Sequence, residues 1–399
     1  MPRVAPFRGL RYDEAVAGPL AALTAPPYDV ISAPRRDSYL ASSPFNVVHL
    51  DLAEGAAEAA TPGNRYDRAS ALLTEWERTR VLTPDDEPRY YAYELDWSAA
   101  PGRSRGGLRG VFCALTLEPW GGGVVPHEHT MPGPIADRLE LLRATRTHLS
   151  PIYGTVAGPL RPLAATLDAA AGTEPLEELL DEEGVRHRLW PLDGELPIGD
   201  WLAEEELLIA DGHHRYTTAL AYRDERDRAE GPGPWDAILA FVVDAGTQTV
   251  PVLPYHRVQL AGEVPRPTRP AANLAEIVGS VRDETLTIGT IVRNDGELSY
   301  GLLTLHGDPP VVRALHAEVL DRHAPGDALR FTHSADDAAA AVRNGDAIAA
   351  YVLPRTTPER VLAAIHHGDR LPRKSTFFWP KPRTGMVFMT IDRPPRPLP

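Results

Sequence analysis

The hydrophobic positions of the first 260 residues follow two patterns, helical spacing and short apolar runs. The clearest helical spacing is that of Ala69, Leu72, Leu73 and Trp76. Helices are predicted over 64–80, 134–146, 159–182 and 213–228. Apolar runs bounded by turn residues predict strands at 46–52, 89–95, 108–117, 206–210 and 235–244. A loop rich in Gly, Ser and Arg at 101–107 joins two of these strands and predicts a long hairpin.

A proline-rich segment, 264–270, is the best candidate for an internal linker. After it, expected strands at 302–305, 329–332 and 347–353 alternate with expected helices at 310–322, 336–343 and 357–367. Alternation of this kind favours an α/β or mixed α+β fold. We therefore predict a core over 1–262, a C-terminal α/β region over 271–392 and a disordered tail over 393–399.

Composition and charge exclude several classes of protein. The 399 residues are 43% hydrophobic and 24% charged, as expected of a chain with a packed core. The net charge of −14 argues against non-specific binding of nucleic acid, which depends on Lys and Arg. No apolar run reaches the length of a membrane span, so we expect a soluble, cytoplasmic protein without a membrane partner. The sequence does not predict an oligomeric state.

The single cysteine, Cys113, rules out an intramolecular disulfide and a CxxC metal site. Its apolar neighbours predict a buried side chain.

The strongest candidate for chemistry is a strand-to-helix turn in the segment 210–216, Ala-Asp-Gly-His-His-Arg-Tyr. Gly212 allows a sharp turn, and the start of the helix after it attracts anions. Arg215 adds a fork of donors that suits phosphate. His213 and His214 could transfer protons, and Asp211 could hold a divalent metal or orient a histidine. The alternative is a capped helix with surface histidines.

A second candidate is the loop 126–134, which contains His127, Glu128 and His129. Glu128 is a candidate general base, and either histidine could polarise or bind a phosphate. The His-x-His spacing resembles a metal site, but no third ligand lies nearby, which disfavours zinc. The alternative is a polar loop that caps the next helix.

The helix expected after that loop carries three arginines. Arg143 and Arg146 are three positions apart, so they should share one helix face and could reach an anion. Arg138 falls elsewhere on the helix and is expected in a surface ion pair with Glu140 or its neighbours.

A third candidate is the segment Lys374-Ser375-Thr376, near the chain's other lysine, Lys381. It resembles the end of a Walker A loop but lacks the preceding glycines, so a P-loop is rejected. A loop that contacts phosphate is still predicted. On the strand expected at 46–52, His49 and Asp51 should share one face, which either lines a pocket or meets water.

Seven motifs, in order along about residues 6–391, resemble the bacterial "domain of unknown function 1015" family. They lie at 25–31, 46–51, 126–130, 137–146, 149–154, 210–216 and 374–376. The turn at 211–215 is similar to the phosphate-binding turn of the ParB/sulfiredoxin superfamily, which includes free-serine kinases. The resemblance implies a ParB/sulfiredoxin-like core with a C-terminal α/β extension.

The resemblance also implies nucleotide-dependent phosphoryl transfer to a small hydroxylated metabolite, such as free serine. The expected cofactors are ATP or ADP with magnesium. Two alternatives stay open, a phosphatase or nucleotide hydrolase using the same pocket, and a non-catalytic protein that senses nucleotide. The chain departs from the family pattern at His129, Thr217 and Arg373, where Lys, Glu and Gln are usual. His213 stands where sulfiredoxin has its catalytic cysteine, which excludes sulfinic acid reduction.

The expected site therefore combines the three candidate segments. The catalytic candidates are His127, Glu128, Asp211, His213 and His214, with Asp211 also the candidate metal ligand. The candidates for binding the cofactor are Arg143, Arg146, Gly212, Arg215, Lys374, Ser375 and Thr376.

Overall fold

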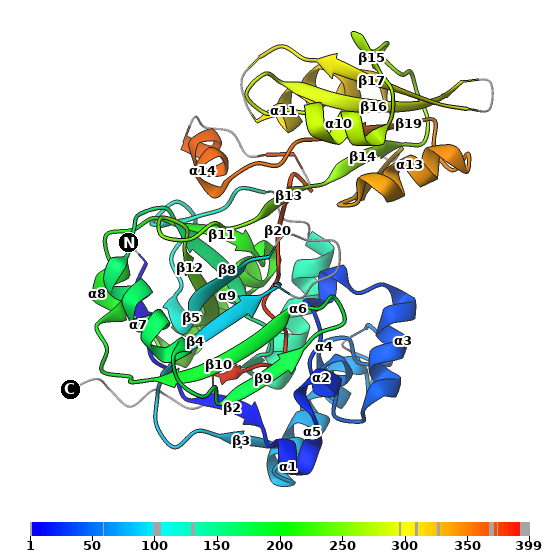
Figure 1. Ribbon diagram of the computed structural model, residues 1–399. Helices are drawn as coiled ribbons and strands as arrows, with labels where there is room; N and C mark the ends of the chain where they lie inside the picture. Colours follow the sequence, from blue (N-terminus) through cyan, green and yellow to red (C-terminus); the bar gives the residue numbers. More distant parts are fainter. Residues whose placement is uncertain are drawn as a thin grey trace. The chain divides into compact units, whose positions relative to one another are not determined.

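The chain folds into two compact units in a computed structural model (Figure 1). The structure describes residues 2–58, 60–98, 105–128, 132–294, 297–307, 310–324, 328–366, 371–372 and 374–391. The first unit comprises 1–126, 130–249 and 380–399, and the second comprises 127–129 and 250–379. Each unit is therefore built from segments that are separated in the sequence.

This division corrects the predicted boundary at 262–271. The second unit begins at Val250, because β14 (His256–Gln259) pairs with two strands of the second unit's sheet. The expected linker, 264–270, runs into β15 (Arg269–Ala271), another strand of that sheet. The chain then returns to the first unit at Pro380. The expected tail, 393–399, lies outside the described residues.

The first unit contains a large mixed sheet with the strand order β6-β11-β8-β12-β5-β4-β10-β9. A further strand, β1, pairs with β5 outside this order. In that order the strands span Val124–Val125, Leu207–Asp211, Ile152–Val156, Ala237–Asp244, Gly107–Thr116, Tyr90–Asp96, Arg186–Leu192 and Glu177–Leu180, and β1 spans Val4–Ala5. The predicted hairpin is confirmed, because β4 and β5 pair antiparallel with Tyr91 opposite Phe112. The pairs β11·β6 and β12·β8 are parallel.

Alternate strand residues of this sheet face two different cores. Ile238, Ala240 and Val242 of β12 belong to one buried cluster with residues of the helices α7, α8 and α9. The residues between them point the other way, where Phe241 packs on Phe112 and Tyr153. The helices of this unit are α1 (Glu14–Ala17), α2 (Leu20–Leu23), η1 (Tyr28–Val30), α3 (Ala33–Ser42), α4 (Val48–Asp51), α5 (Arg65–Arg78), α6 (Pro132–Thr145), α7 (Arg161–Ala171), α8 (Ile198–Leu202), α9 (His213–Glu230) and η2 (Pro234–Asp236).

A smaller sheet in the first unit joins distant parts of the chain. Its order is β3-β2-β21-β7, with bounds Leu82–Pro84, Gly9–Tyr12, Phe388–Thr390 and Thr147–His148. The segment that leads into β21 is anchored by Arg383, whose guanidinium donates to the Thr24 carbonyl at 2.8 Å. The C-terminal segment is thus part of this unit's core.

The second unit has a six-stranded sheet covered on both faces. Its order is β15-β17-β16-β19-β14-β18, with bounds Arg269–Ala271, Glu297–Thr304, Thr287–Asn294, Ala349–Val352, His256–Gln259 and Leu329–Thr332. One core includes α11 (Val311–Leu315) and the π-helix η3 (His316–Leu320), followed by α12 (Asp321–His323). The other includes α10 (Leu274–Ser280) and α13 (Ala335–Arg343). A two-stranded ribbon pairs β13 (Val252–Pro254) with β20 (Thr376–Phe378), and α14 spans Pro358–His366.

The mixed α/β fold is confirmed, but two predicted elements are wrong. The segment expected as a strand at 46–52 forms the short helix α4, because the Asn46 side chain accepts the Val48 N–H at 3.0 Å and supports a helical turn. The helix expected over 159–182 ends at Ala171, where Gly172 caps it, and β9 follows. Cys113 is fully buried, as predicted. Within the described ranges, no helix combines the length and apolar character of a membrane span.

Candidate functional site

The predicted strand-to-helix turn is present in the first unit. β11 ends at Asp211, and α9 begins at His213. Gly212 between them has φ 94° and ψ 26°, a left-handed conformation that favours glycine. A Cβ atom at Gly212 would lie 2.9 Å from Ile152 and 3.2 Å from the Arg215 guanidinium, so packing also requires glycine here.

Asp211 is the centre of a buried ion-pair cluster. One carboxylate oxygen accepts from Lys381, and the other accepts from Arg215, one helical turn further on. The side chains are 11% exposed for Asp211 and Arg215 and 9% exposed for Lys381. Lys381, one of the two lysines in the chain, was not among the predicted binding residues.

Burial by itself raises the pKa of Asp211, but the positive charges of Lys381 and Arg215 outweigh it. The pKa of this carboxyl is therefore held well below its ordinary value, and Asp211 is ionised at neutral pH. Both oxygens are already engaged by cations, which does not fit the predicted role as a magnesium ligand. The part of the chain that the structure describes has no group of three or more His, Cys, Asp or Glu residues that could hold a metal ion.

Arg215 is held by Ser150 and Pro151, just before β8, and lines a small cavity of about 50 Å³. Its guanidinium donates to Ser150 Oγ at 2.8 Å and to the Pro151 carbonyl, in addition to Asp211. Its Nε atom is buried and has no hydrogen-bond partner among the described residues. Tyr28, Asp51, Arg138 and Ser150 line the same cavity.

Arg138 is buried, which corrects its prediction as a surface residue. It is 8% exposed and pairs with Asp51 at 2.7 Å and with Asp137. Its guanidinium also stacks on the Tyr28 ring, 4.4 Å from the centroid. Burial is the main reason that the pKa of Tyr28 rises to about 12, and burial also raises the pKa of Asp51. His49 and Asp51 were expected to share one face of a strand. Both lie on the helix α4 instead, where residues two positions apart point in different directions.

The two histidines of the turn lie in the first turn of α9. His213 is 9% exposed, and its ring stacks on Trp120 with a centroid distance of 6.3 Å. His214 is half-buried. The positive charge of a protonated His213 would further lower the pKa of Asp211. The alternative of surface histidines is therefore wrong for His213.

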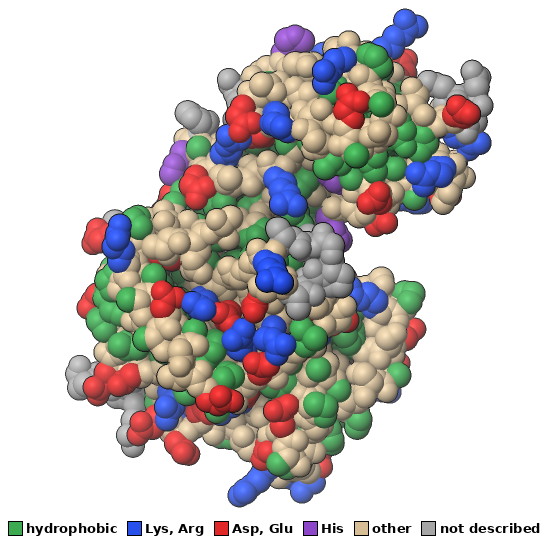
Figure 2. Space-filling view, in the orientation of Figure 1, with side chains coloured by type: hydrophobic (Ala, Val, Ile, Leu, Met, Phe, Trp, Pro, Cys, Tyr) green, Lys and Arg blue, Asp and Glu red, His purple; other side chains and the backbone are tan. Residues whose placement is uncertain are grey.

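Arg143 and Arg146 do not share a helix face as predicted. α6 ends at Thr145, and Arg146 follows in a left-handed conformation with φ 48°. Arg143 is 39% exposed and pairs with Glu140 and Glu225. Charged side chains of both signs are interspersed over the face of the first unit seen in Figure 2.

In the second unit, the segment 127–128 contacts the segment 374–376, which leads into β20. Glu128 Oε1 accepts the backbone N–H of Lys374 at 2.9 Å, and His127 Nε2 lies 2.6 Å from Thr376 Oγ1. Ser375 Oγ donates to the Pro372 carbonyl. Lys374 has φ 55°, an unusual conformation for a residue other than glycine. The structure thus brings together two of the three segments that the sequence singled out.

Arg257 is a residue of this region that the sequence did not indicate. It is fully buried, and its guanidinium donates to the Lys374 carbonyl at 2.7 Å. Burial lowers its pKa to about 10, although the negative charge of Glu128 acts in the opposite direction. Lys374 is therefore held through its N–H by Glu128 and through its carbonyl by Arg257. His129 and Arg373, two departures from the family pattern, lie outside the described residues.

The predicted site residues fall into two groups. Asp211, Gly212, His213, His214 and Arg215 belong to the first unit, with Arg143 and Arg146. His127, Glu128, Lys374, Ser375 and Thr376 belong to the second.

Several solved structures are similar to this chain at low sequence identity. A conserved hypothetical protein from Pyrococcus furiosus has a TM-score of 0.36 and 14% identity, over 71% of this chain and 96% of that one. A free serine kinase in complex with AMP has a TM-score of 0.37 and 14% identity, over 71% and 92%. SbnI with a C-terminal truncation, from Staphylococcus aureus, has a TM-score of 0.32 and 10% identity, over 68% and 85%.

No curated protein matches the chain. The family whose sequence profile matches is described as protein of unknown function (DUF1015), and the match covers residues 4–304. Because this match spans well over half of the chain, the protein belongs to that family.

Proposed function

We propose that the turn at Asp211–Arg215 binds a phosphate group of ATP or ADP, and that the protein transfers a phosphoryl group to a small hydroxylated metabolite such as free serine. The observation that carries the proposal is the buried cluster of Asp211, Arg215 and Lys381 at the Gly212 end of α9.

The charge of this cluster suits an anion. Two cations surround one ionised carboxylate, so the three side chains together carry a net positive charge in a buried setting. The N-terminus of α9 adds the positive end of a helix dipole, and Gly212 has no side chain that could cap it. Excess buried charge is costly, and a phosphate oxygen beside the cluster would offset it.

The size of the cavity limits what can enter it. The cavity of about 50 Å³ is far smaller than the roughly 300–1,000 Å³ of small-molecule pockets, so it has no room for a whole nucleotide. Arg215 is the residue of the turn that lines this cavity. We propose that a phosphate oxygen bound at the turn reaches Arg215 and that the rest of the nucleotide lies outside the cavity.

We further propose that Glu128 is the carboxylate that activates the acceptor hydroxyl, and that His127, Lys374, Ser375 and Thr376 bind substrate. A carboxylate near the acceptor is what phosphoryl transfer to a hydroxyl needs.

No step is assigned to a protein-bound magnesium, because both oxygens of Asp211 are engaged. The relation of the turn to the ParB/sulfiredoxin superfamily and the cytoplasmic location also stay predictions.

Thermal unfolding with ATP, ADP or CTP, each with and without magnesium, tests the binding step. We expect at least one nucleotide to raise the melting temperature of the wild type and of Arg228→Ala, an exposed arginine on the same helix. The shift should disappear in Arg215→Ala. The absence of a shift with every nucleotide would rule out nucleotide binding.

A product assay tests the reaction. Free hydroxy amino acids are incubated with ATP, and both released phosphate and phosphorylated amino acid are measured. Formation of phosphoserine supports the kinase. Release of phosphate without a phosphorylated product would instead assign a hydrolase, and nucleotide binding without either product would assign a sensor.

A further inference from the structure

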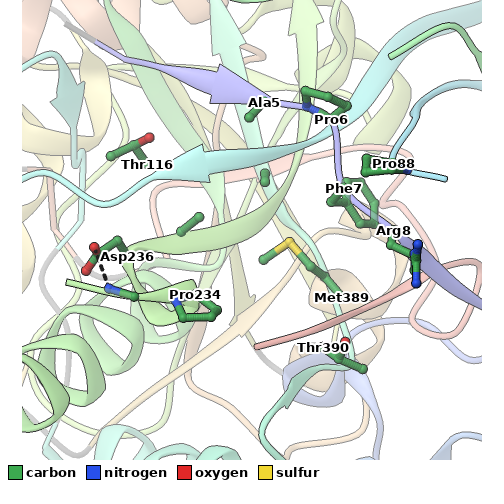
Figure 3. Close-up of a pocket in the computed structure, with 13 residues that line it drawn as sticks. Ala5, Pro6, Phe7, Arg8, Pro88, Thr116, Pro234, Asp236, Met389 and Thr390 are labelled. Carbon is green, nitrogen blue, oxygen red and sulfur yellow. Dashed lines mark hydrogen bonds between the residues drawn. The ribbon is translucent and has the colours of Figure 1, made fainter. Parts of the chain in front are cut away.

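A second, larger cavity in the first unit lies among segments that take no part in the proposed phosphate site. Its volume is about 450 Å³, within the range of small-molecule sites. β1 and β5 form one side, η2 and the start of β12 another, and β21 a third. Figure 3 shows the side chains that line it.

The lining is apolar in the middle and charged at two opposite sides. Pro6, Phe7 and Met389 lie between Asp236 on one side and Arg8 on the other (Figure 3). Arg8 is exposed and uses one nitrogen to donate to the Asp86 carbonyl at 2.6 Å. Asp236 accepts the Gly233 N–H at 3.0 Å through Oδ2, and its side chain also has a hydrogen bond with Asp227.

The backbone around this cavity is already paired, so the cavity is not an open strand edge. Ala5 pairs with Ala114, and Ala237 pairs with Thr116. The carbonyl of Asp236 accepts the Leu117 N–H at 2.8 Å. A ligand would therefore be recognised by side chains, through apolar contact in the middle and charge at the ends, and not by addition of a strand.

We propose that this cavity binds an elongated small molecule with an apolar body, an anionic group beside Arg8 and a hydrogen-bond donor beside Asp236. A guanidinium recognises a carboxylate or another anion through charge-assisted hydrogen bonds, and a carboxylate accepts from an ammonium or a hydroxyl. Phe7, Pro6 and Met389 bury the apolar body, and Met389 can adapt to its shape. The proposal does not depend on the function of the Asp211–Arg215 turn.

Three probes with the same apolar chain test the proposal by ligand-observed NMR titration of the full-length protein. They are 8-aminooctanoate, octanoate and octylamine. We expect 8-aminooctanoate to bind most tightly and octanoate more tightly than octylamine. Arg8→Ala should weaken octanoate about tenfold, which corresponds to loss of one charge-assisted hydrogen bond, and leave octylamine unchanged.

Two further variants make the test specific. Arg3→Ala removes an exposed arginine from the same N-terminal segment, outside the cavity lining, and should leave all three affinities unchanged. Thr116→Trp fills the cavity and should abolish binding, and Thr390→Trp fills it from another strand if the first variant fails to fold. The proposal is overturned if no probe binds saturably to the wild type, if octylamine binds as tightly as octanoate, or if Arg3→Ala weakens octanoate as much as Arg8→Ala does.

Discussion

His148 and Met389 are cross-strand partners of the small sheet, and they line different cavities of the first unit. His148 lies at the cavity beside Arg215, whereas Met389 lies at the larger cavity beside Arg8. His148 Nε2 is 3.2 Å from the carbonyl of Ala237, which also lines the larger cavity. The strands β7 and β21 therefore contribute paired residues to the linings of two different cavities.

The buried position of His148 predicts a pH-dependent stability. Burial lowers the pKa of His148 to about 4, so the folded protein keeps this ring neutral when the unfolded chain, with a pKa near 6.5, is protonated. The free energy of unfolding is then highest above pH 6.5 and falls as the pH drops toward 4. We expect the wild type to lose about 2 kcal/mol more than His148→Gln between pH 7 and pH 5.

Urea unfolding of both proteins at several pH values measures this difference. Other buried histidines, including His256, whose pKa burial also lowers to about 4, contribute equally to both proteins and cancel in the comparison. Identical pH dependence of the two proteins would show that His148 has no part in it.

Gly212→Ala should destabilise the first unit for two reasons. The left-handed backbone strains any other residue, and the new Cβ would lie 2.9 Å from Ile152. We expect a loss of about 2–4 kcal/mol from strain and overpacking together. Gly63→Ala is the matched control, because Gly63 also has positive φ but no atom of the described residues lies within 4 Å of the added atom. Equal losses in the two variants would contradict the packing argument.

Asp211→Asn should be costly because it leaves Lys381 and Arg215 as two buried cations without a carboxylate. Breaking a buried ion pair on one side costs about 3–5 kcal/mol. Adding Lys381→Met removes one of the cations, so the double variant should be more stable than Asp211→Asn alone. Glu75→Gln breaks an exposed pair with Arg78 and should change stability by less than about 1 kcal/mol. A double variant less stable than Asp211→Asn would refute this account of the cluster.

Two substitutions at Glu128 separate a structural role from a catalytic one. Gln keeps an oxygen that can accept the Lys374 N–H, whereas Ala removes it. Glu128→Gln should therefore retain the melting temperature of the wild type, and Glu128→Ala should lower it. If Glu128 is the base, both should reduce the transfer rate by at least about 100-fold. Full activity of Glu128→Gln would leave only the structural role.

The elements that the sequence predicted correctly are those fixed by local interactions. α5 occupies Arg65–Arg78, close to the predicted 64–80, because Asn64 caps it by accepting from Tyr66 and Asp67. Its apolar residues also repeat with the helical period. The prediction of a strand at 46–52 was wrong. The apolar run of this segment resembles a buried strand, and apolar runs of this length do not distinguish a strand from a short buried helix.

The turn at Asp211–Arg215 could be predicted from the sequence, because a buried strand, a glycine and a helix start are consecutive and each follows from local conformational preference. The charges that surround this turn depend on tertiary contacts. Lys381 lies 170 positions from Asp211, and Arg138 lies 87 positions from Asp51. The same holds for the division into units, which depends on strand pairing across the chain. Pairing between such distant residues follows from the packing of whole elements, which no local pattern of residues specifies.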